Sequence, residues 1–263
     1  MGYKMSNNLD QIKILVCCHK SVELPKNDLF LPIQVGAALT ENHWGIQRDD
    51  KVYDKDCDNI SLKNSNYCEL TAVYWAWKNI TNMYPNIKYI GLCHYRRFFS
   101  LNSKIVKQLR KAIVLPNLWI TPYSVENAYK IAHPCSDFDV LRDVVNEKYP
   151  EYKESFKQVL ELNNKSTLYN MFIMPISIFN DYCSWLFDIL FDVEKKINIV
   201  SYDKYQKRVF GFMSERLLYV YIKHNKLKCK QNFIEGPETV SIRKYLMNKI
   251  RFNIAFYLGK KRK

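Results

Sequence analysis

Short runs of consecutive apolar residues alternate along the chain with longer segments in which apolar positions recur every three or four residues. The short runs are rich in strand-forming side chains and predict buried strands at residues 12–18, 88–93, 118–121 and 170–174. The longer segments predict helices over about residues 67–80, 136–150, 178–195 and 214–224. Asn66, three residues before Glu69, and Ser136 are the expected caps of the first two helices.

Strands that are apolar throughout and alternate with helices are typical of a mostly parallel sheet flanked by helices, so the predicted fold class is α/β. With 263 residues the chain can form one large domain with a substantial core. We expect this domain to span residues 1–242 and a basic amphipathic tail to span residues 243–263. In open sheets of this kind ligands bind beyond the carboxyl ends of the strands, so polar residues there are the first candidates for a site.

The tail has the composition of a membrane-surface helix. It contains no acidic residue and eight basic ones, which are Arg243, Lys244, Lys249, Arg251, Lys260, Lys261, Arg262 and Lys263. A stripe of apolar residues at helical spacing lies beside this charge, namely Leu246, Ile250, Ile254, Tyr257 and Leu258. Such a helix is expected to bind an anionic membrane surface in the plane of the interface. The alternative is that the stripe packs on the domain.

Composition narrows the choice of partner. The net charge of +14 calls for an anionic one, such as nucleic acid, acidic lipid or a phosphorylated small molecule. The 19 tyrosines suit sugar binding, although an AT-rich genome also favours tyrosine codons. The eight cysteines form no C-x-x-C pair, which argues against a zinc site or a disulfide framework. Because no signal core and no apolar stretch of about 18 residues occurs, we expect a cytoplasmic protein, peripheral on the inner face of the membrane through its tail.

The most specific candidates for chemistry are His94, Tyr95, Arg96 and Arg97, which follow the predicted strand at residues 88–93. Guanidinium groups match phosphate oxygens with two hydrogen bonds and keep their charge, so an arginine pair at this position predicts a diphosphate-binding site. The alternative is that one arginine pairs with an acidic residue while the other is solvated.

Three further residues lie at the ends of predicted strands. His19 and Lys20 follow the first strand, and Asn170 begins the fourth. Because strand ends meet at the edge of the sheet where ligands bind, we expect these side chains to contact the nucleotide or the sugar.

Several common sites are missing from the sequence. Neither G-x-G-x-x-G nor a P-loop motif occurs, which excludes a Rossmann dehydrogenase and a P-loop enzyme. Metal-type D-x-D strings occur at residues 54–56, 56–58 and 137–139, but the first two lie in a charged loop and the third opens a helix. A D-x-D that binds a metal-diphosphate should directly follow an apolar strand. We therefore expect no cofactor and no divalent metal.

Glu215 and Arg216 begin a predicted helix after the apolar residues 209–213. A carboxylate beside an apolar patch is a reasonable general base, and Glu215 is our first candidate. The alternative is a glutamate in the first turn that satisfies the backbone amides of the helix.

Long blocks of the sequence resemble the family known as domain of unknown function 4422. One of them is Gly91-Leu-Cys-His-Tyr-Arg-Arg-Phe-Phe99, and the others are residues 58–64, 67–78, 169–174, 182–190 and 208–218. The likeness extends from about residue 12 to about residue 221. Members of the family are similar to glycosyltransferases of capsule, exopolysaccharide or O-antigen assembly, and some transfer galactofuranose from its uridine-diphosphate donor.

The resemblance implies a GT-A-like fold that binds a UDP-sugar donor and a lipid-linked or oligosaccharide acceptor. Arginines stand where GT-A enzymes usually carry D-x-D, which argues against a metal. The family blocks nominate Asp58, Asn59, Glu69, His94, Tyr95, Arg96, Arg97, Asn170, Glu215 and Arg216 as site residues. Asp58 and Glu69 are the bases that we would consider after Glu215. Trp75, Trp77 and Trp185 have the helical spacing of core residues. His133 lies at a position that the family tends to fill with histidine, before a capped helix, and we expect it to make a structural hydrogen bond.

Two other classes of function remain at this stage. A basic nucleic-acid-binding protein should spread its charge over one face with exposed aromatic residues in between, whereas here the basic cluster is terminal. We therefore expect no nucleic-acid partner. A non-catalytic scaffold of a polysaccharide-assembly complex would keep the fold without turnover.

Overall fold

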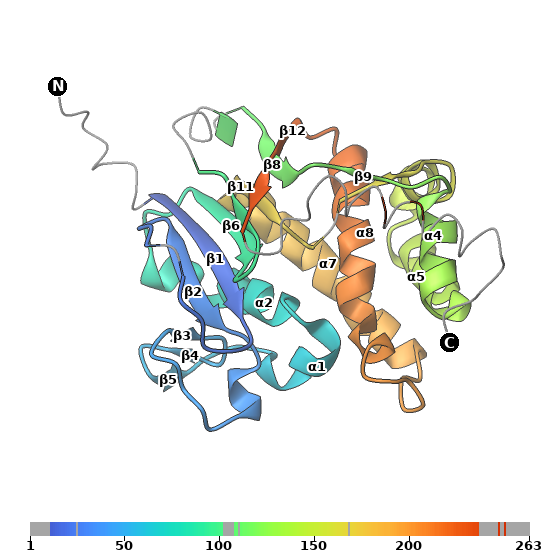
Figure 1. Cartoon of the computed structure of the whole chain (residues 1–263). Coiled ribbons are helices and arrows are strands. Elements are labelled where there is room, and N and C mark those ends of the chain that lie inside the picture. Colours follow the sequence, from blue (N-terminus) through green and yellow to red (C-terminus); the bar gives the residue numbers. More distant parts are fainter. Residues whose placement is uncertain are drawn as a thin grey trace.

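The computed structural model describes residues 11–24, 26–101, 108–109, 111–167, 169–236, 247 and 250. A seven-stranded sheet forms its centre, with the strand order β12-β8-β11-β6-β1-β2-β3 (Figure 1). In chain order these strands are β1 (Ile12–Cys18), β2 (Phe30–Gln34), β3 (Gln47–Arg48), β6 (Tyr89–His94), β8 (Ile113–Pro116), β11 (Phe172–Pro175) and β12 (Cys229–Asn232). Every neighbouring pair is parallel except the two that include β11, which runs antiparallel to β6 and β8. The predicted α/β class and the mostly parallel sheet are confirmed.

Three of the four predicted strands lie in this sheet. The run at residues 12–18 is β1 without any change of boundary, the run at 88–93 is β6, and the run at 170–174 is β11. The prediction at residues 118–121 is wrong for the central sheet. Those residues contribute β9 (Trp119–Ile120), which pairs only with β10 (Lys165–Ser166), and the central strand is β8, formed by the preceding apolar run.

Within the described residues, three two-stranded sheets accompany the central one. The first contains β9 and β10. In the second, β4 (Lys51–Val52) and β5 (Lys55–Asp56) form a hairpin whose turn residues Tyr53 and Asp54 have positive φ. In the third, β7 (Phe98–Phe99) pairs with β13 (Ile234–Glu235), and this contact joins the chain beyond β12 to the end of β6.

The main helices are α1 (Asn64–Tyr67), α2 (Leu70–Met83), α4 (Val125–Ala132), α5 (Cys135–Lys148), α6 (Lys153–Phe156), α7 (Ile176–Lys196) and α8 (Val209–His224). Short 3₁₀ or π turns cover Ala37–Leu39, Ser61–Lys63, Pro150–Tyr152, Lys157–Glu161 and Gln206–Arg208. None of the helices in the described ranges is long and apolar enough to cross a membrane.

Three predicted helix starts are wrong. The Asn66 amide donates to the carbonyl of Lys207 rather than capping α2, which begins at Leu70. Ser136 lies inside α5, because that helix already begins at Cys135. The run Val209–Met213 is the buried start of α8 and not a segment before it, so Glu215 lies in the second turn of that helix.

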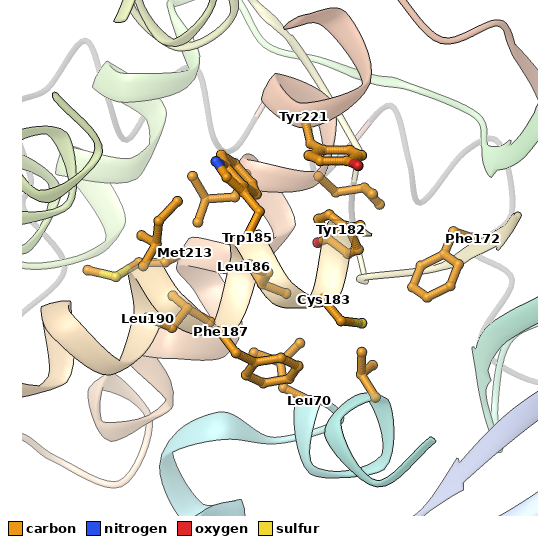
Figure 2. Packing of buried hydrophobic residues seen from close by; sticks show 14 of the residues in the cluster. Leu70, Phe172, Tyr182, Cys183, Trp185, Leu186, Phe187, Leu190, Met213 and Tyr221 are labelled. Carbon is orange, nitrogen blue, oxygen red and sulfur yellow. The ribbon is translucent and has the colours of Figure 1, made fainter. Parts of the chain in front are cut away.

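The larger core lies where α2, α5, α7 and α8 pack together against the sheet. Every residue predicted to point inward from α7, including Tyr182, Trp185 and Leu186, is buried, and Figure 2 shows these side chains between α7 and its neighbours. Replacing a leucine such as Leu186 by alanine should cost about 2–5 kcal/mol of stability. Trp75 is fully buried as predicted, and its indole donates to the carbonyl of Lys51. A second, smaller core covers the other face of the sheet with residues that include Phe98, Phe99 and Leu109.

Candidate functional site

A tight turn at the carboxyl end of β6 presents the two candidate arginines. The amide of His94 donates to the carbonyl of Arg97 at 3.1 Å, and the amide of Arg97 donates to the carbonyl of His94 at 3.0 Å. Tyr95 and Arg96 are therefore the corner of the hairpin that joins β6 to β7. We call residues 94–97 the arginine turn.

The chain beyond β13 supports this turn from behind. Gly236 has a φ of +132°, and a Cβ at this position would lie only 2.4 Å from the carbonyl oxygen of Arg96. A backbone approach this close is open only to glycine. The arginine turn is thus fixed by the β7–β13 pairing on one side and by the Gly236 backbone on the other.

Aromatic rings lie under the cationic groups of the turn. The guanidinium of Arg97 is 4.2 Å from the ring centroid of Tyr169, and that of Arg96 is 4.9 Å from the ring of Tyr95. The ammonium of Lys20 is 5.6 Å from the Tyr95 ring, and the Tyr95 hydroxyl is hydrogen-bonded at 3.3 Å to Nε2 of His19. These contacts hold the cationic groups against aromatic rings, a geometry that attracts them to the ring faces.

The corner before β11 reaches the same edge of the sheet, because β11 runs antiparallel to β6. Tyr169 and Asn170 both have left-handed backbone conformations, with φ of 69° and 53°. Such residues cost roughly 1–3 kcal/mol each and persist only where their surroundings hold them. Here His94 Nε2 donates to the Tyr169 carbonyl at 2.6 Å, and Oε1 of Glu215 accepts from the Tyr169 amide at 2.9 Å. Strain of this kind concentrates at functional sites.

The side chain of Asn170 joins three elements. Its amide donates to Oε1 of Glu69 at 2.7 Å, at the start of α2, and to the carbonyl of Gly211 at 3.2 Å, in α8. Its Oδ1 accepts from the hydroxyl of Ser214 at 2.8 Å. Asn170 is 1% exposed, and a buried amide without hydrogen-bond partners would destabilise the fold. These bonds remove that cost. The network places Glu69 next to the first turns of α8.

Glu215 lies between this network and a buried arginine. Its Oε2 is 2.8 Å from Nη1 of Arg216, which also donates to the carbonyl of Phe212. Burial raises the pKa of the Glu215 carboxyl, and the nearby Arg216 acts in the opposite direction. A carboxyl with a raised pKa is a stronger base once it is ionised, which suits a group that accepts a proton near neutral pH.

Arg208 is a further residue of this region that the sequence reasoning did not select. Its Nε lies 3.2 Å from Sγ of Cys68, a residue with a positive φ directly before Glu69. The Arg208 guanidinium also interacts electrostatically with Glu69, with Glu215 and, across the sheet edge, with His19. Its place at the head of the sequence block 208–218 was the signal that could have identified it.

The pKa of His19 depends on charges from several parts of this region. The pKa of His19 is lowered by burial and then by the charges of Arg96 and Lys20, with smaller contributions from Arg208 and His94. The histidine is therefore neutral near pH 7 in a strongly positive field. An anion that binds among these cations would favour its protonation.

Ten of the twelve candidate residues lie in this one region, which we call the edge site. They are His19, Lys20, Glu69, His94, Tyr95, Arg96, Arg97, Asn170, Glu215 and Arg216. A hollow of about 400 Å³ lies elsewhere, and none of these ten residues lines it; its walls are Lys63, Phe191, Glu194 and Lys195.

Asp58 and Asn59 lie outside the edge site. Oδ1 of Asp58 accepts from the hydroxyl of Tyr74, and its carbonyl accepts from the amide of Asn79, both along the side of α2. The Asn59 side chain closes its own loop by accepting from the amide of Ser61. These contacts hold the loop before α2 and are made without any of the other candidates.

The aspartate pairs also have local partners. Asp56 lies in the β4–β5 hairpin with a 96% exposed side chain that pairs with Lys51. In α5, Asp137 accepts from the hydroxyl of Tyr202, and Asp139 pairs with lysine and arginine side chains. Within the described ranges, no group of three or more histidine, cysteine or acidic side chains has the arrangement of a metal site.

The sequence profile of the family described as domain of unknown function 4422 matches residues 13–226. The chain belongs to this family. Among solved structures it is similar to WbbM, described as a bifunctional glycosyltransferase in its apo state, with 28% sequence identity and a TM-score of 0.75. The similarity covers 87% of the present chain but only 46% of the WbbM chain. No curated protein sequence matches this DUF4422 member.

Proposed function

We propose that this DUF4422 protein is a glycosyltransferase that uses a UDP-linked sugar donor. The observation that carries the proposal is the edge site itself, where the arginine turn and two carboxylates, Glu69 and Glu215, meet beyond the end of β6. The fold shared with WbbM supports a transferase rather than a nucleic-acid-binding protein. Because the chain corresponds to less than half of WbbM, the activity of that protein is not carried over as a whole.

In the proposed reaction the arginine turn binds the diphosphate of the donor. The bond between the anomeric carbon and the diphosphate oxygen breaks, and an acceptor hydroxyl oxygen forms the new bond to that carbon. The hydroxyl proton passes to a carboxylate, for which Glu215 is our first candidate. Arg96 and Arg97 stabilise the charge that develops on the leaving UDP, and such preorganised charges are often the largest contribution to catalysis.

The finer parts of the proposal rest on the family resemblance. Galactofuranose is the donor sugar that we put first, and the acceptor is a lipid-linked or oligosaccharide chain of a growing surface polysaccharide. Binding at the cytoplasmic face of an anionic membrane through the tail, residues 243–263, belongs to the same proposal. Apart from Met247 and Ile250, which are helical and more than half exposed, the tail lies outside the described residues.

Incubation with a panel of nucleotide sugars, with release of nucleoside diphosphate as the readout, tests the proposed activity. We expect release from at least one UDP-sugar and thermal stabilisation by UDP but not by single-stranded DNA. Stabilisation by DNA alone would favour the nucleic-acid-binding alternative. Binding of UDP without turnover of any donor would favour a non-catalytic scaffold.

Sedimentation with liposomes tests the membrane part. The full chain should sediment with vesicles that contain acidic lipid at low salt and dissociate at high salt, because each basic residue near the surface contributes about 1 kcal/mol. A chain that ends at Ser241 should stay in the supernatant and keep its turnover of a small acceptor. If the full chain did not bind these vesicles at low salt, we would conclude that the apolar stripe of the tail packs on the domain.

A further inference from the structure

An exposed tyrosine next to the edge site has the surroundings of a sugar-binding ring. Tyr205 is 51% exposed, yet its ring is held on its inner side by two other rings. Phe212 of α8 lies 5.1 Å away between centroids, and the nearly parallel ring of His133 lies 6.0 Å away. His133 in turn stacks on Phe212 at 4.2 Å. The three aromatic groups, from the end of α4, the start of α8 and the segment before α8, thus form one layer with Tyr205 on its outer side.

The backbone presents this ring in a fixed position. Oδ1 of Asp203 accepts hydrogen bonds from the amides of Tyr205 and Gln206, both at 2.8 Å. The Gln206 side chain then continues to His133, where Oε1 accepts from Nδ1 at 2.9 Å, and to the carbonyl of Ala132. Because a ring that is already ordered loses little conformational freedom on binding, it is a favourable contact for a ligand.

Polar groups adjoin the aromatic layer, as recognition of a sugar requires. The guanidinium of Arg208 lies 5.3 Å from the centroid of Phe212 and 6.0 Å from that of Tyr205. Burial lowers the pKa of His133 to about 4, so the ring is neutral and Nδ1 carries the proton donated to Gln206. Nε2 of the same ring is then a hydrogen-bond acceptor, and it makes no hydrogen bond to any of the described residues.

The aromatic layer lies on the helical side of the edge site, and this position indicates which of the two substrates it would contact. Arg208 links it to Cys68 and to the carboxylates Glu69 and Glu215 on the helical side of the edge site. The arginine turn approaches that site from the β6 side. A donor bound at the turn would therefore have its diphosphate on one side, while a second substrate would reach the carboxylates past Tyr205 and Arg208.

We propose that Tyr205, His133, Phe212 and Arg208 form the subsite for the sugar ring of the acceptor, with Tyr205 as its stacking surface. The apolar C–H face of a pyranose or furanose packs on the tyrosine ring, and its hydroxyls bond to Arg208 and His133. This inference rests on the proposed glycosyltransferase function and adds the position of the second substrate. Stacking of the uracil base of the donor on Tyr205 is the competing use of the same ring.

Fluorine NMR of the full chain labelled with 3-fluorotyrosine tests binding directly. The Tyr205→Phe and Tyr53→Phe variants identify the two signals, and Tyr53 is the matched control because it is 68% exposed in the β4–β5 hairpin, outside the edge site. Methyl and p-nitrophenyl glycosides of common hexoses are added to protein saturated with UDP. We expect at least one glycoside to shift the Tyr205 signal and leave that of Tyr53 unchanged. A Tyr205 signal that responds to UDP alone, or equal shifts at both residues, would overturn the proposal.

Kinetics with the glycoside that binds best separate this inference from the proposed function. Tyr205→Ala should raise the KM for the acceptor about tenfold. Tyr205→Trp should keep the acceptor KM close to the wild-type value, because the larger ring can still stack on the sugar. Tyr53→Ala should leave the acceptor KM unchanged. The KM for the donor, and its slow hydrolysis in the absence of acceptor, should stay at the wild-type level in all three. A rise in the donor KM instead would assign Tyr205 to the nucleotide. If the wild type neither transferred nor hydrolysed the donor sugar, that result would contradict the proposed function rather than the subsite.

Discussion

His133 should make the stability of the fold depend on pH in a direction that the structure specifies. The residue is 9% exposed, stacks on Phe212 and donates to Gln206, and burial lowers its pKa from 6.5 to about 4. The folded chain therefore binds this proton less tightly than the unfolded chain does. The contribution of neutral His133 is fully present above pH 6.5 and is lost progressively as the pH falls towards 4.

The size of the effect follows from the two pKa values. Between pH 7.5 and pH 5 the linkage relation gives a loss of about 2 kcal/mol in the free energy of unfolding from this one group. Other groups titrate in the same range, so the quantity to measure is the difference between the wild type and His133→Gln. Glutamine keeps a polar side chain but does not titrate.

Urea unfolding at pH 7.5, 6.0 and 5.0 measures this difference. At pH 7.5 the wild type should be the more stable of the two, and its advantage should shrink by about 2 kcal/mol at pH 5. Equal pH dependence of the two proteins would show that the ring is not held neutral by burial.

Three further outcomes are expected. Glu215→Gln should bind UDP normally but turn over about 10²–10⁴ times more slowly in the diphosphate-release assay, and a variant that keeps most of its activity would move the search to Glu69 or Asp58. Turnover should survive excess EDTA, whereas loss of activity that manganese restores would refute the expected independence from divalent metal. Gly236→Ala should weaken UDP binding in calorimetry, because its Cβ would lie 2.4 Å from the Arg96 carbonyl. Gly45→Ala is the matched control, since Gly45 also has a positive φ but no atom within 4 Å, and equal UDP affinities would contradict the role of Gly236.

The sequence predicted the elements whose apolar pattern is strong and local. The seven-residue run of β1 and the inward face of α7 have their predicted positions, because burial on one face determines both patterns. The strand β8 was missed because it is only four residues long and ends at Pro116. Its apolar pattern is therefore short, and the neighbouring segment that contains Trp119 was predicted as the strand instead.

The start of α8 shows a different limit. The run Val209–Met213 is apolar on every side and contains Gly211, a pattern that does not distinguish a strand from a buried helix. In the folded chain Gly211 lies against Cys68, where a Cβ would be 3.4 Å from Sγ, an ordinary van der Waals distance.

The candidate site was predictable to the extent that it follows from strand ends. Polar residues directly after β1 and β6, and before β11, do lie at one edge of the sheet. The pairings across that edge join residues far apart in the chain, as in the stacking of Arg97 on Tyr169 and the contact of Arg208 with Cys68. No local pattern encodes such contacts, which is why Arg208 was missed and why Asp58, chosen from its sequence block, lies elsewhere.

Calorimetric titration of UDP into arginine variants tests the central claim, that the arginine turn binds the diphosphate of a nucleotide sugar. Alanine at the position that contacts the diphosphate, Arg96 or Arg97, should weaken UDP binding about 10- to 100-fold, as expected for loss of a charge-assisted hydrogen bond. Lysine there should recover only part of the affinity, because an ammonium cannot make the paired contact. Lys195→Ala, which removes an exposed cation of α7, should bind UDP like the wild type. Wild-type affinity in both Arg96→Ala and Arg97→Ala, or no binding of UDP by the wild type, would contradict the account.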